Sequence, residues 1–397
     1  MRHNWAAVAR AVLLLVGAFV VLPGLFPQAM TVSGQIPPDD PTAGWLWVWR
    51  QPPYEFWVVD EHVYIRPYAD VVAWQRPGSG TLFAMTNGEA SVAPPDLYIS
   101  ADSGASWQHS FVDGLNVTDV LVVHPVTPTI LFAGGENVYP PGGVFRSEDG
   151  GLHWNNVLSN TIVYDIEVDP LNPQRVYAAT CCLPPPASTG GIYRSNDLGQ
   201  TWEMISAQWL HDLEAHPSVP GRVLGVRFFS TGADEGVYRS DDGGTTWTQV
   251  AGIRQSRIVI DPRNPDQVFA FGGERNGILR SDDGGTSWVD VTGNLPHPLA
   301  TAPTILSATL DPNLPGTIWV GQKYSGIFVS HTAGGAWVPV NDGLPFILDD
   351  VDGPQCSSIS ISSDGKYAVA CSGWVFVGLP PGSLDNHVYL PLVMGGR

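Results

Sequence analysis

The chain has 397 residues, enough for two or three ordinary domains or for one large repeat domain. Only 14% of the residues are charged, whereas 44 glycines and 35 prolines are spread along the chain, a composition that indicates many short strands joined by tight turns. The formal net charge of −19 excludes the basic surface that binding to nucleic acid or to an anionic membrane would require.

The N-terminus has the pattern of an export signal. Arg2 and Arg10 accompany an apolar run at residues 11–26, which is shorter than the roughly 20 residues that a membrane span needs. Small residues suited to cleavage follow, so we assign residues 1–30 to a signal peptide and expect a secreted, extracellular or cell-surface protein. The alternative is an uncleaved anchor, which would hold the protein at a membrane through this segment alone.

A turn motif of eight residues recurs along the chain. Its copies are SADSGASW, SEDGGLHW, SNDLGQTW, SDDGGTTW, SDDGGTSW and the degenerate SHTAGGAW, and their tryptophans are 47, 48, 45, 41 and 49 residues apart. A second motif, [DH]-P-x-x-P, precedes most copies and begins at His124, Asp169, His216, Asp261 and Asp311. Two motifs in the same phase, with a period of about 40 to 50 residues, indicate propeller blades of four strands.

The unit that starts at Arg257 shows how one blade is expected to fold. RIVID is a first strand, the prolines of PRNP favour a turn, and QVFAFGG is a second strand. GILRS is a third strand, DDGGTS a turn and WVDV a fourth strand, all within the usual strand lengths.

The turn motif resembles the Asp-box (BNR) repeat, S-x-D-x-G-x-[ST]-W, which connects the third and fourth strands of blades in sialidases, sortilin-type ectodomains and photosystem II assembly factors. The resemblance covers about residues 70–380 and would make the chain an exported bacterial member of this superfamily. It implies carboxylates that bond the turn backbone, at Asp102, Asp149, Asp197, Asp242 and Asp283. It also implies tryptophans that pack between blades, at Trp107, Trp154, Trp202, Trp247, Trp288 and Trp337. Thr332 replaces the acid in the sixth copy, so a weaker turn is expected there.

The fold predicted from these repeats is all-β, a single β-propeller of seven four-stranded blades, with six or eight blades as alternatives. Six units carry the turn motif, and a seventh supplies only three strands, SSISIS, KYAVACS and WVFVGL. Its fourth strand is expected from the N-terminal segment, from WLWVWR at 45–50 or from FWVVDEHVYI at 56–65, which would close the ring and remove a free sheet edge. The expected division is residues 1–30 signal peptide, 31–69 closing segment, 70–380 propeller and 381–397 tail.

Three tryptophans alternate in the first of these candidate strands. Trp45, Trp47 and Trp49 share one strand face, which is either a buried blade face or a platform on which a sugar could stack.

Four cysteines occur in the chain. Cys356 and Cys371 flank a predicted hairpin that turns at residues 364–365, and this hairpin would bring them nearly opposite each other. Because export favours oxidation, we predict a disulfide between these two, leaving Cys181 and Cys182 as a vicinal bridge or as two buried thiols. No paired C-x-x-C spacing is present, so zinc is not expected.

The repeated acids have a structural and a chemical interpretation. A tight turn needs the same carboxylate in every blade, whereas a catalytic acid is needed only once, so a turn-stabilising role is favoured. The alternative interpretation is calcium binding by DDGG or by LDDVDG at 348–353, but the alternating ligand spacing of a calcium loop is absent. No metal and no cofactor are therefore expected, and His124 and His216 are interpreted as turn residues like the aspartates they replace.

The predicted ligand site lies on the face opposite the repeated turns. Loops of irregular sequence gather there, at 86–96, 136–143, 181–191, 229–236 and 272–277, and variable loops on a rigid scaffold commonly carry binding residues. Tyr139, Glu274 and Arg275 are the proposed ligand-binding residues. The expected function is an exported, monomeric, non-catalytic binding or scaffold protein that recognises a protein or a glycan.

The alternative function is a glycoside hydrolase, either sialidase-like or xyloglucanase-like. A sialidase would need several arginines pointing into the channel, yet Arg146, Arg194, Arg239 and Arg280 all belong to the repeat. A glycosidase would need two carboxylates about 5 to 10 Å apart with solvent as their only partner.

Overall fold

The computed structural model describes most of the residues between 46 and 379. The described residues are 46–49, 55–59, 62–66, 69–74, 81–86, 96–111, 120–135, 142–181, 190–228, 234–272, 277–296, 304–323, 325–341, 344, 356–361, 367–371 and 374–379. They form strands and turns, and they contain no helix long and apolar enough to cross a membrane. The predicted signal peptide and the C-terminal tail lie outside the described residues.

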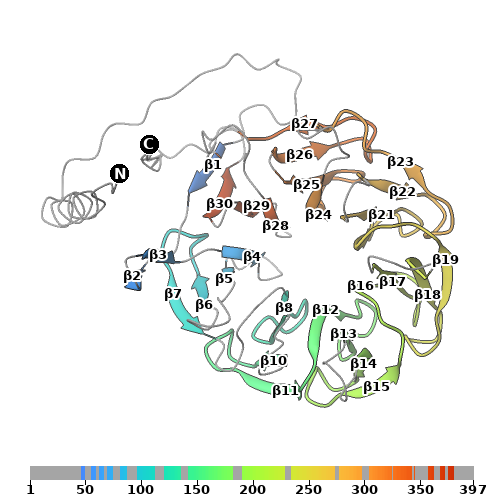
Figure 1. Cartoon of the computed structure of the whole chain (residues 1–397), viewed down its shortest axis with the longest axis horizontal. Coiled ribbons are helices and arrows are strands. Elements are labelled where there is room, and N and C mark those ends of the chain that lie inside the picture. Colours follow the sequence, from blue (N-terminus) through green and yellow to red (C-terminus); the bar gives the residue numbers. More distant parts are fainter. Residues whose placement is uncertain are drawn as a thin grey trace, which may run out of the picture.

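The strands form a β-propeller, whose blades surround a common centre (Figure 1). Six sheets each consist of four consecutive antiparallel strands, and we number these blades 1 to 6 in chain order. A further four-stranded sheet, blade 7, combines the last three strands of the chain with the first. The strands therefore give seven four-stranded sheets in all, and the first strand of each blade lies nearest the centre of the ring.

The bounds of the strands in blades 1 to 3 are β4 Ala69–Trp74, β5 Leu82–Thr86, β6 Asp96–Ser100, β7 Gln108–Phe111, β8 Val120–Val123, β9 Leu131–Gly134, β10 Gly143–Ser147, β11 Asn155–Ser159, β12 Ile162–Val168, β13 Val176–Cys181, β14 Gly191–Ser195 and β15 Glu203–Ser206. Those of blades 4 to 6 are β16 Asp212–Ala215, β17 Val223–Arg227, β18 Gly236–Ser240, β19 Thr248–Ala251, β20 Arg257–Ile260, β21 Val268–Phe271, β22 Leu279–Ser281, β23 Val289–Asp290, β24 Ile305–Leu310, β25 Ile318–Gln322, β26 Gly326–Ser330 and β27 Val338–Pro339.

Blade 7 contains β28 Cys356–Ile361, β29 Tyr367–Cys371, β30 Trp374–Leu379 and β1 Leu46–Trp49. β1 runs antiparallel to β30, with Leu46 opposite Leu379 and Trp49 opposite Phe376. This is the pairing of the two chain ends that the sequence WLWVWR predicts. The other candidate segment instead forms a separate hairpin of β2 Glu55–Val59 and β3 His62–Arg66. The sugar-platform interpretation lies outside the described residues, since the side chains of the three tryptophans are not described.

The hydrophobic core is divided among the junctions between neighbouring blades. Seven clusters of buried side chains are present, and each joins strands of two blades that follow one another around the ring. One cluster, for example, unites Tyr177 of blade 3 with Leu213 of blade 4, and Trp247 packs against it. The other motif tryptophans occupy the same place at their own junctions, at Trp107, Trp154, Trp202, Trp288 and Trp337. The tryptophans therefore fill the wedge between adjacent sheets, which a large aromatic ring suits.

The two repeated turns of a blade lie against each other on one face of the ring. In blade 3 the amide of Leu198 donates to the carbonyl of Gln174, and in blade 5 the amide of Gly284 donates to that of Asp266. Equivalent bonds join the turns of blades 2, 4 and 6. This face, which we call the turn face, is thus built mainly from structural turns, and the irregular loops join the opposite ends of the strands.

No free thiol is present among the described cysteines. Cys181 and Cys356 are both disulfide-bonded. Cys356 lies opposite Cys371 in the register of β28 and β29, which is the placement that the predicted hairpin requires. Cys182 lies outside the described residues.

Candidate functional site

The residues predicted to bind ligand are not among those that the structure describes. Tyr139, Glu274 and Arg275 fall in undescribed parts of their loops, and so do most residues of the other irregular segments. The described structure instead shows what the repeated acids do, and it reveals a cluster of carboxylates on the inner strands.

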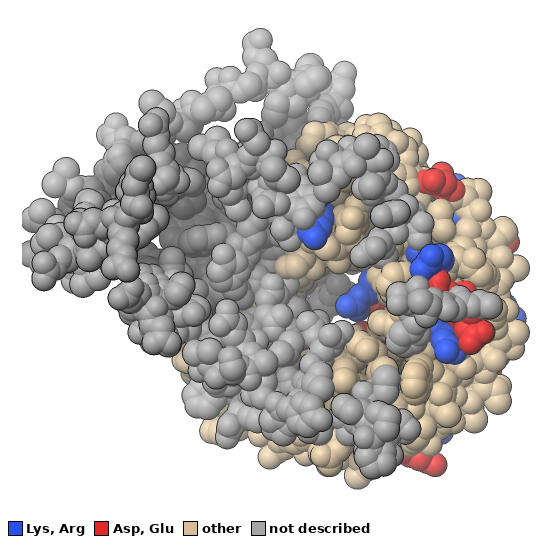
Figure 2. Space-filling view, in the orientation of Figure 1, with Lys and Arg blue, Asp and Glu red and all other residues tan. Residues whose placement is uncertain are grey.

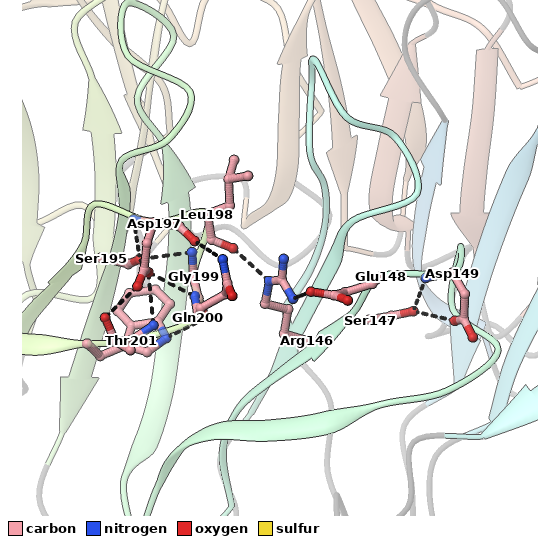
Figure 3. Close-up of polar contacts among 11 residues, drawn as sticks. Arg146, Ser147, Glu148, Asp149, Ser195, Asp197, Leu198, Gly199, Gln200 and Thr201 are labelled. Carbon is pink, nitrogen blue, oxygen red and sulfur yellow. Dashed lines mark hydrogen bonds and ion pairs between the residues drawn. The ribbon is translucent and has the colours of Figure 1, made fainter.

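Each turn aspartate bonds the backbone of its own turn. Asp242 accepts hydrogen bonds from the amides of Thr245 and Thr246 at 3.1 and 2.9 Å, and from the Thr246 hydroxyl at 2.6 Å. Asp197 has the same arrangement with Gln200 and Thr201 (Figure 3). The corresponding amide bonds occur at Asp102, Asp149 and Asp283. In the sixth copy the Thr332 hydroxyl accepts one such bond, from Ala336 at 3.1 Å, which fits the weaker turn expected there.

The charge of these aspartates is stabilised locally. Hydrogen bonds from Thr246, first from its hydroxyl and then from its amide, lower the pKa of Asp242 to about 2. The corresponding bonds from Ser287 lower the pKa of Asp283 to about 2. A carboxylate with a lowered pKa is a poor general acid, so these residues are suited to holding turns and not to proton transfer.

The buried serine of the motif also stabilises the turn through its hydroxyl group. The Ser240 hydroxyl donates to Asp242 at 2.7 Å and accepts the amide of the buried Gly244 at 2.9 Å. Ser240 is only 1% exposed, so its hydroxyl replaces solvent as the partner of that glycine amide.

Three of the arginines that precede the motif serine connect their blade with the next one. Arg146 Nε donates to the Leu198 carbonyl at 2.7 Å, across the junction of blades 2 and 3 (Figure 3). Arg194 reaches the Gly243 carbonyl at 3.0 Å, and Arg280 reaches the Ala333 carbonyl at 2.9 Å. These arginines hold neighbouring turns together and are not directed at a ligand carboxylate.

Histidine replaces aspartate in two of the proline turns. His216 Nδ1 accepts the amides of Ser218 and Val219 at 3.2 and 3.1 Å, as Asp169 Oδ1 does with Leu171 and Asn172. His124 Nδ1 likewise accepts the amide of Thr127 at 2.9 Å. The acceptor role requires an unprotonated Nδ1, and burial, with the nearby charge of Arg222, lowers the pKa of His216 accordingly.

The main concentration of perturbed ionisable groups lies on the inner strands of blades 3 and 4. Alternate residues of a strand point to the same side, so Asp165 and Glu167 share one side of β12, and Asp212 and Glu214 share one side of β16. We call these four residues the inner-wall carboxylates. Asp212 is buried, whereas the other three keep partial exposure.

Each inner-wall carboxylate bonds the backbone of the next blade. Asp165 accepts the Leu213 amide at 2.8 Å, and Glu167 accepts the Ala215 amide at 3.2 Å. One blade further on, Asp212 accepts the Ile258 amide at 2.7 Å and Glu214 accepts the Ile260 amide at 3.3 Å. The carboxylates therefore satisfy amides on inner-strand edges, which face a neighbouring sheet without pairing with it.

Burial raises the pKa of every inner-wall carboxylate, and repulsion from a neighbouring carboxylate adds to the shift in three of them. Burial raises the pKa of Asp165 to about 7, with a further contribution from the charge of Asp212. Burial and Asp212 also raise the pKa of Glu214 to about 8. The pKa of Glu167 rises through burial and the charge of Glu214, and burial raises the pKa of Asp212 despite its contact with Arg257.

The inner wall does not have the pattern of a glycosidase site. Raised pKa values are typical of catalytic acids, but here every carboxylate has a backbone partner, whereas a catalytic pair would face solvent and substrate. Arg257 is the single basic residue on the first strands of the blades, and it pairs with Asp212 at 3.1 Å, so these strands do not form a sialidase-like arginine clamp. The described residues contain no group of histidine, cysteine and acidic side chains suited to a metal ion.

Charged groups on the outer surface are mostly paired locally. Arg222 and Arg239 both contact Asp241, and Arg254 pairs with Glu235. On the described part of the face in Figure 2, basic side chains stand apart from one another and several adjoin acidic ones.

Sequence analysis did not single out the inner wall, although a signal for it exists. The segments YDIEV and HDLEA place acids two and four residues before the Asp169 and His216 turns, in two consecutive blades. Acids that alternate within a strand usually indicate a solvent-facing surface, so the pattern is informative only once these strands are known to face the ring centre.

Comparisons with known proteins agree with the fold. No protein-family model matches the chain, and no curated protein matches it. Two structures of YCF48 are similar in three dimensions. The one described as bound to D1 peptide has a TM-score of 0.55 at 16% identity, covering 85% of this chain and 97% of that one. YCF48 from Cyanidioschyzon merolae has a TM-score of 0.56 at 13% identity, covering 86% of this chain and all of that one (100%).

The GH74 enzyme of Niastella koreensis is also similar, with a TM-score of 0.44 at 18% identity. The match covers 75% of this chain but only 53% of the enzyme, so this chain corresponds to about half of it. At 16% and 13% identity, the two YCF48 similarities establish the β-propeller fold and leave the ligand open.

Proposed function

We propose that this protein is an exported, non-catalytic propeller that binds a polypeptide through the irregular loops opposite the turn face. The observation that carries the proposal is that the inner-wall carboxylates are already occupied by hydrogen bonds within the protein. The described acids with raised pKa values are each bonded to a backbone amide of the next blade, and so hold the scaffold together.

The choice of polypeptide over glycan is supported by the YCF48 likeness. That similarity spans nearly the whole of both chains, and one of the structures is described as bound to D1 peptide. The net charge of −19 further favours ligands with a basic segment over acidic ones. Export, with residues 1–30 as the signal, and a monomeric state remain parts of this proposal.

A comparison of two sets of variants tests the proposed face. Tyr139→Ala and Arg275→Ala alter irregular loops, whereas Val126→Ser and Leu314→Ser alter exposed side chains of the turn face, which are 66% and 47% exposed. Polypeptides captured from an extracellular extract by the purified protein would be identified and their affinities measured for each variant. We expect the loop variants to weaken binding about tenfold, as the loss of about 1.4 kcal/mol from one good contact would do, and the turn-face variants to leave it unchanged.

The same preparation distinguishes the alternative activities. A glycan array and turnover assays with xyloglucan and a sialoside would be run in parallel. Turnover of either substrate would overturn the non-catalytic proposal, binding to glycans alone would replace the polypeptide with a glycan, and weakened binding only in the turn-face variants would move the site to that face.

A further inference from the structure

The inner strands of blades 3, 4 and 5 are joined by carboxylates and not by a sheet. β12, β16 and β20 belong to separate sheets, and the bonds from the inner-wall carboxylates to Leu213, Ala215, Ile258 and Ile260 bridge them. We call the contact along these three strands the acidic seam. The junction between blades 7 and 1 differs, because there the Val72 amide donates to the Ser358 hydroxyl at 3.2 Å.

Few opposing charges face the acidic seam. Among the described residues, Arg257 on β20 is the basic group in contact with the seam, and it pairs with Asp212 at 3.1 Å. His211, which precedes β16, stacks on Tyr164 with ring centroids 4.5 Å apart, and burial, with the charge of Arg257, lowers its pKa to about 4. It is therefore neutral at the pH values at which the carboxylates titrate.

The other described strands packed against the seam add no compensating charge. β8, β9, β21 and β24 carry no ionisable side chain. β13 carries Tyr177, whose surroundings are Arg175 and Asp169, and β17 ends at Arg227, which pairs with Asp234 at 3.7 Å. β10 contributes Arg146, which is bonded to the Leu198 carbonyl and to Glu148. Four ionised carboxylates would thus face one guanidinium.

We propose that the acidic seam is a proton-dependent joint of the ring: blades 3, 4 and 5 are held tightly while the inner-wall carboxylates retain protons, and the joint loosens when all four are charged. A protonated carboxyl keeps its carbonyl oxygen as an acceptor for the amide of the next blade, so the bridging bonds survive protonation. Full ionisation keeps the acceptors but adds repulsion among groups that water screens poorly.

The sign of the pH dependence follows from the direction of the pKa shifts. Ordinary aspartate and glutamate titrate near pH 4, whereas Asp165 and Glu214 titrate at about 7 and about 8 in the folded protein. Between these values the closed joint binds more protons than the open one. For Asp165 and Glu214, each unit rise in pH across this range therefore makes the closed state about tenfold less favoured per group, and the loss from each group is complete above its pKa in the folded protein.

Hydrogen exchange measured by mass spectrometry on the full chain from pH 6 to pH 9, corrected for the intrinsic pH dependence of exchange, tests this directly. Peptides that cover Leu213, Ala215, Ile258 and Ile260 report the acidic seam. Peptides that cover Val72 report a junction whose described inter-blade bond is to a hydroxyl and not to a carboxylate. We expect protection at the acidic seam to fall about tenfold per pH unit or more near pH 7, while protection at Val72 stays flat. Equal pH profiles at the two junctions would overturn the proposal, and this comparison needs no variant.

Asp165→Asn and Glu214→Gln provide a second test, because each amide keeps an acceptor oxygen and removes the charge. The pH dependence at the acidic seam should weaken in each single variant and weaken further in the double variant, in which Glu167 and Asp212 still titrate. If it persists unchanged in the double variant, other groups are responsible and the proposal is wrong. Glu203→Gln, an exposed acid on the outer strand β15, serves as the matched control and should behave as the unaltered chain does.

Discussion

Replacing Ser240 with alanine tests the structure of the repeated turn most sharply. The substitution removes one oxygen from a site that is 1% exposed and leaves the turn aspartate in place. Ser240 accepts the Gly244 amide at 2.9 Å and donates to Asp242 at 2.7 Å. Gly244 is buried, so its amide would lose its partner without gaining water in exchange.

The expected cost has two components. Leaving a buried amide without a partner costs about 1 to 3 kcal/mol. Loss of the bond to Asp242 adds roughly 0.5 kcal/mol, because that carboxylate is exposed and water replaces the hydroxyl. We therefore expect Ser240→Ala to lower the free energy of unfolding by about 1.5 to 3.5 kcal/mol. Thr246→Val, which removes an exposed hydroxyl bonded to the other oxygen of Asp242 at 2.6 Å, should cost less than about 1 kcal/mol.

Urea unfolding followed by tryptophan fluorescence measures both variants, since Trp247 packs at the same junction. A shift for Ser240→Ala no larger than that for Thr246→Val would refute the view that the buried serine, and not the exposed hydroxyl, secures the turn.

Three further predictions concern the turns. Gly199→Ala should destabilise the protein severely, because a Cβ atom would lie 2.2 Å from the Phe132 ring at a backbone angle φ of +76°. Gly284→Ala, at φ +69° with nothing within 4 Å, should cost only about 1 to 2 kcal/mol, and thermal unfolding compares the two. His216→Asp should reduce the loss of stability between pH 7 and pH 5, because the histidine, with its lowered pKa, stabilises the turn only while neutral; an unchanged difference between the unfolding midpoints at the two pH values would contradict this. Asp242→Asn should flatten the fall in stability between pH 4 and pH 2, because a carboxylate with a pKa of about 2 contributes above pH 4 and loses that contribution as acid protonates it; acid titration of the unfolding midpoint, with Glu203→Gln as control, measures the difference.

The propeller was predictable because its determinants are local and repeated. A serine, an aspartate, glycines and a tryptophan at fixed spacing encode a turn whose bonds close within five residues, and the proline turns behave similarly. The role of His216 as a turn residue was also predictable, because it occupies the motif position that aspartate fills in other blades. The role of β1 could be inferred because a three-stranded last blade leaves an unpaired edge.

Other features depend on tertiary context that one sequence does not supply. Leu198 in blade 3 and Ala333 in blade 6 replace the first glycine of the motif. Both still have positive φ angles, of 62° and 52°, because the rest of the turn fixes the backbone there. The acids of β12 and β16 are typical of an exposed strand face, and only the ring geometry encloses them. The three arginines that reach the next blade were correctly assigned to the repeat, but their cross-blade partners follow from the angle between sheets.

The most direct test of the structural role of the repeated acids is ligand binding by the double variant Asp242→Asn/Asp283→Asn, measured by calorimetry well below its unfolding temperature with the captured polypeptide. We predict an unchanged Kd together with a lowered unfolding midpoint. Loss of binding with an unchanged midpoint would show that the turn acids contact the ligand themselves and would contradict the account.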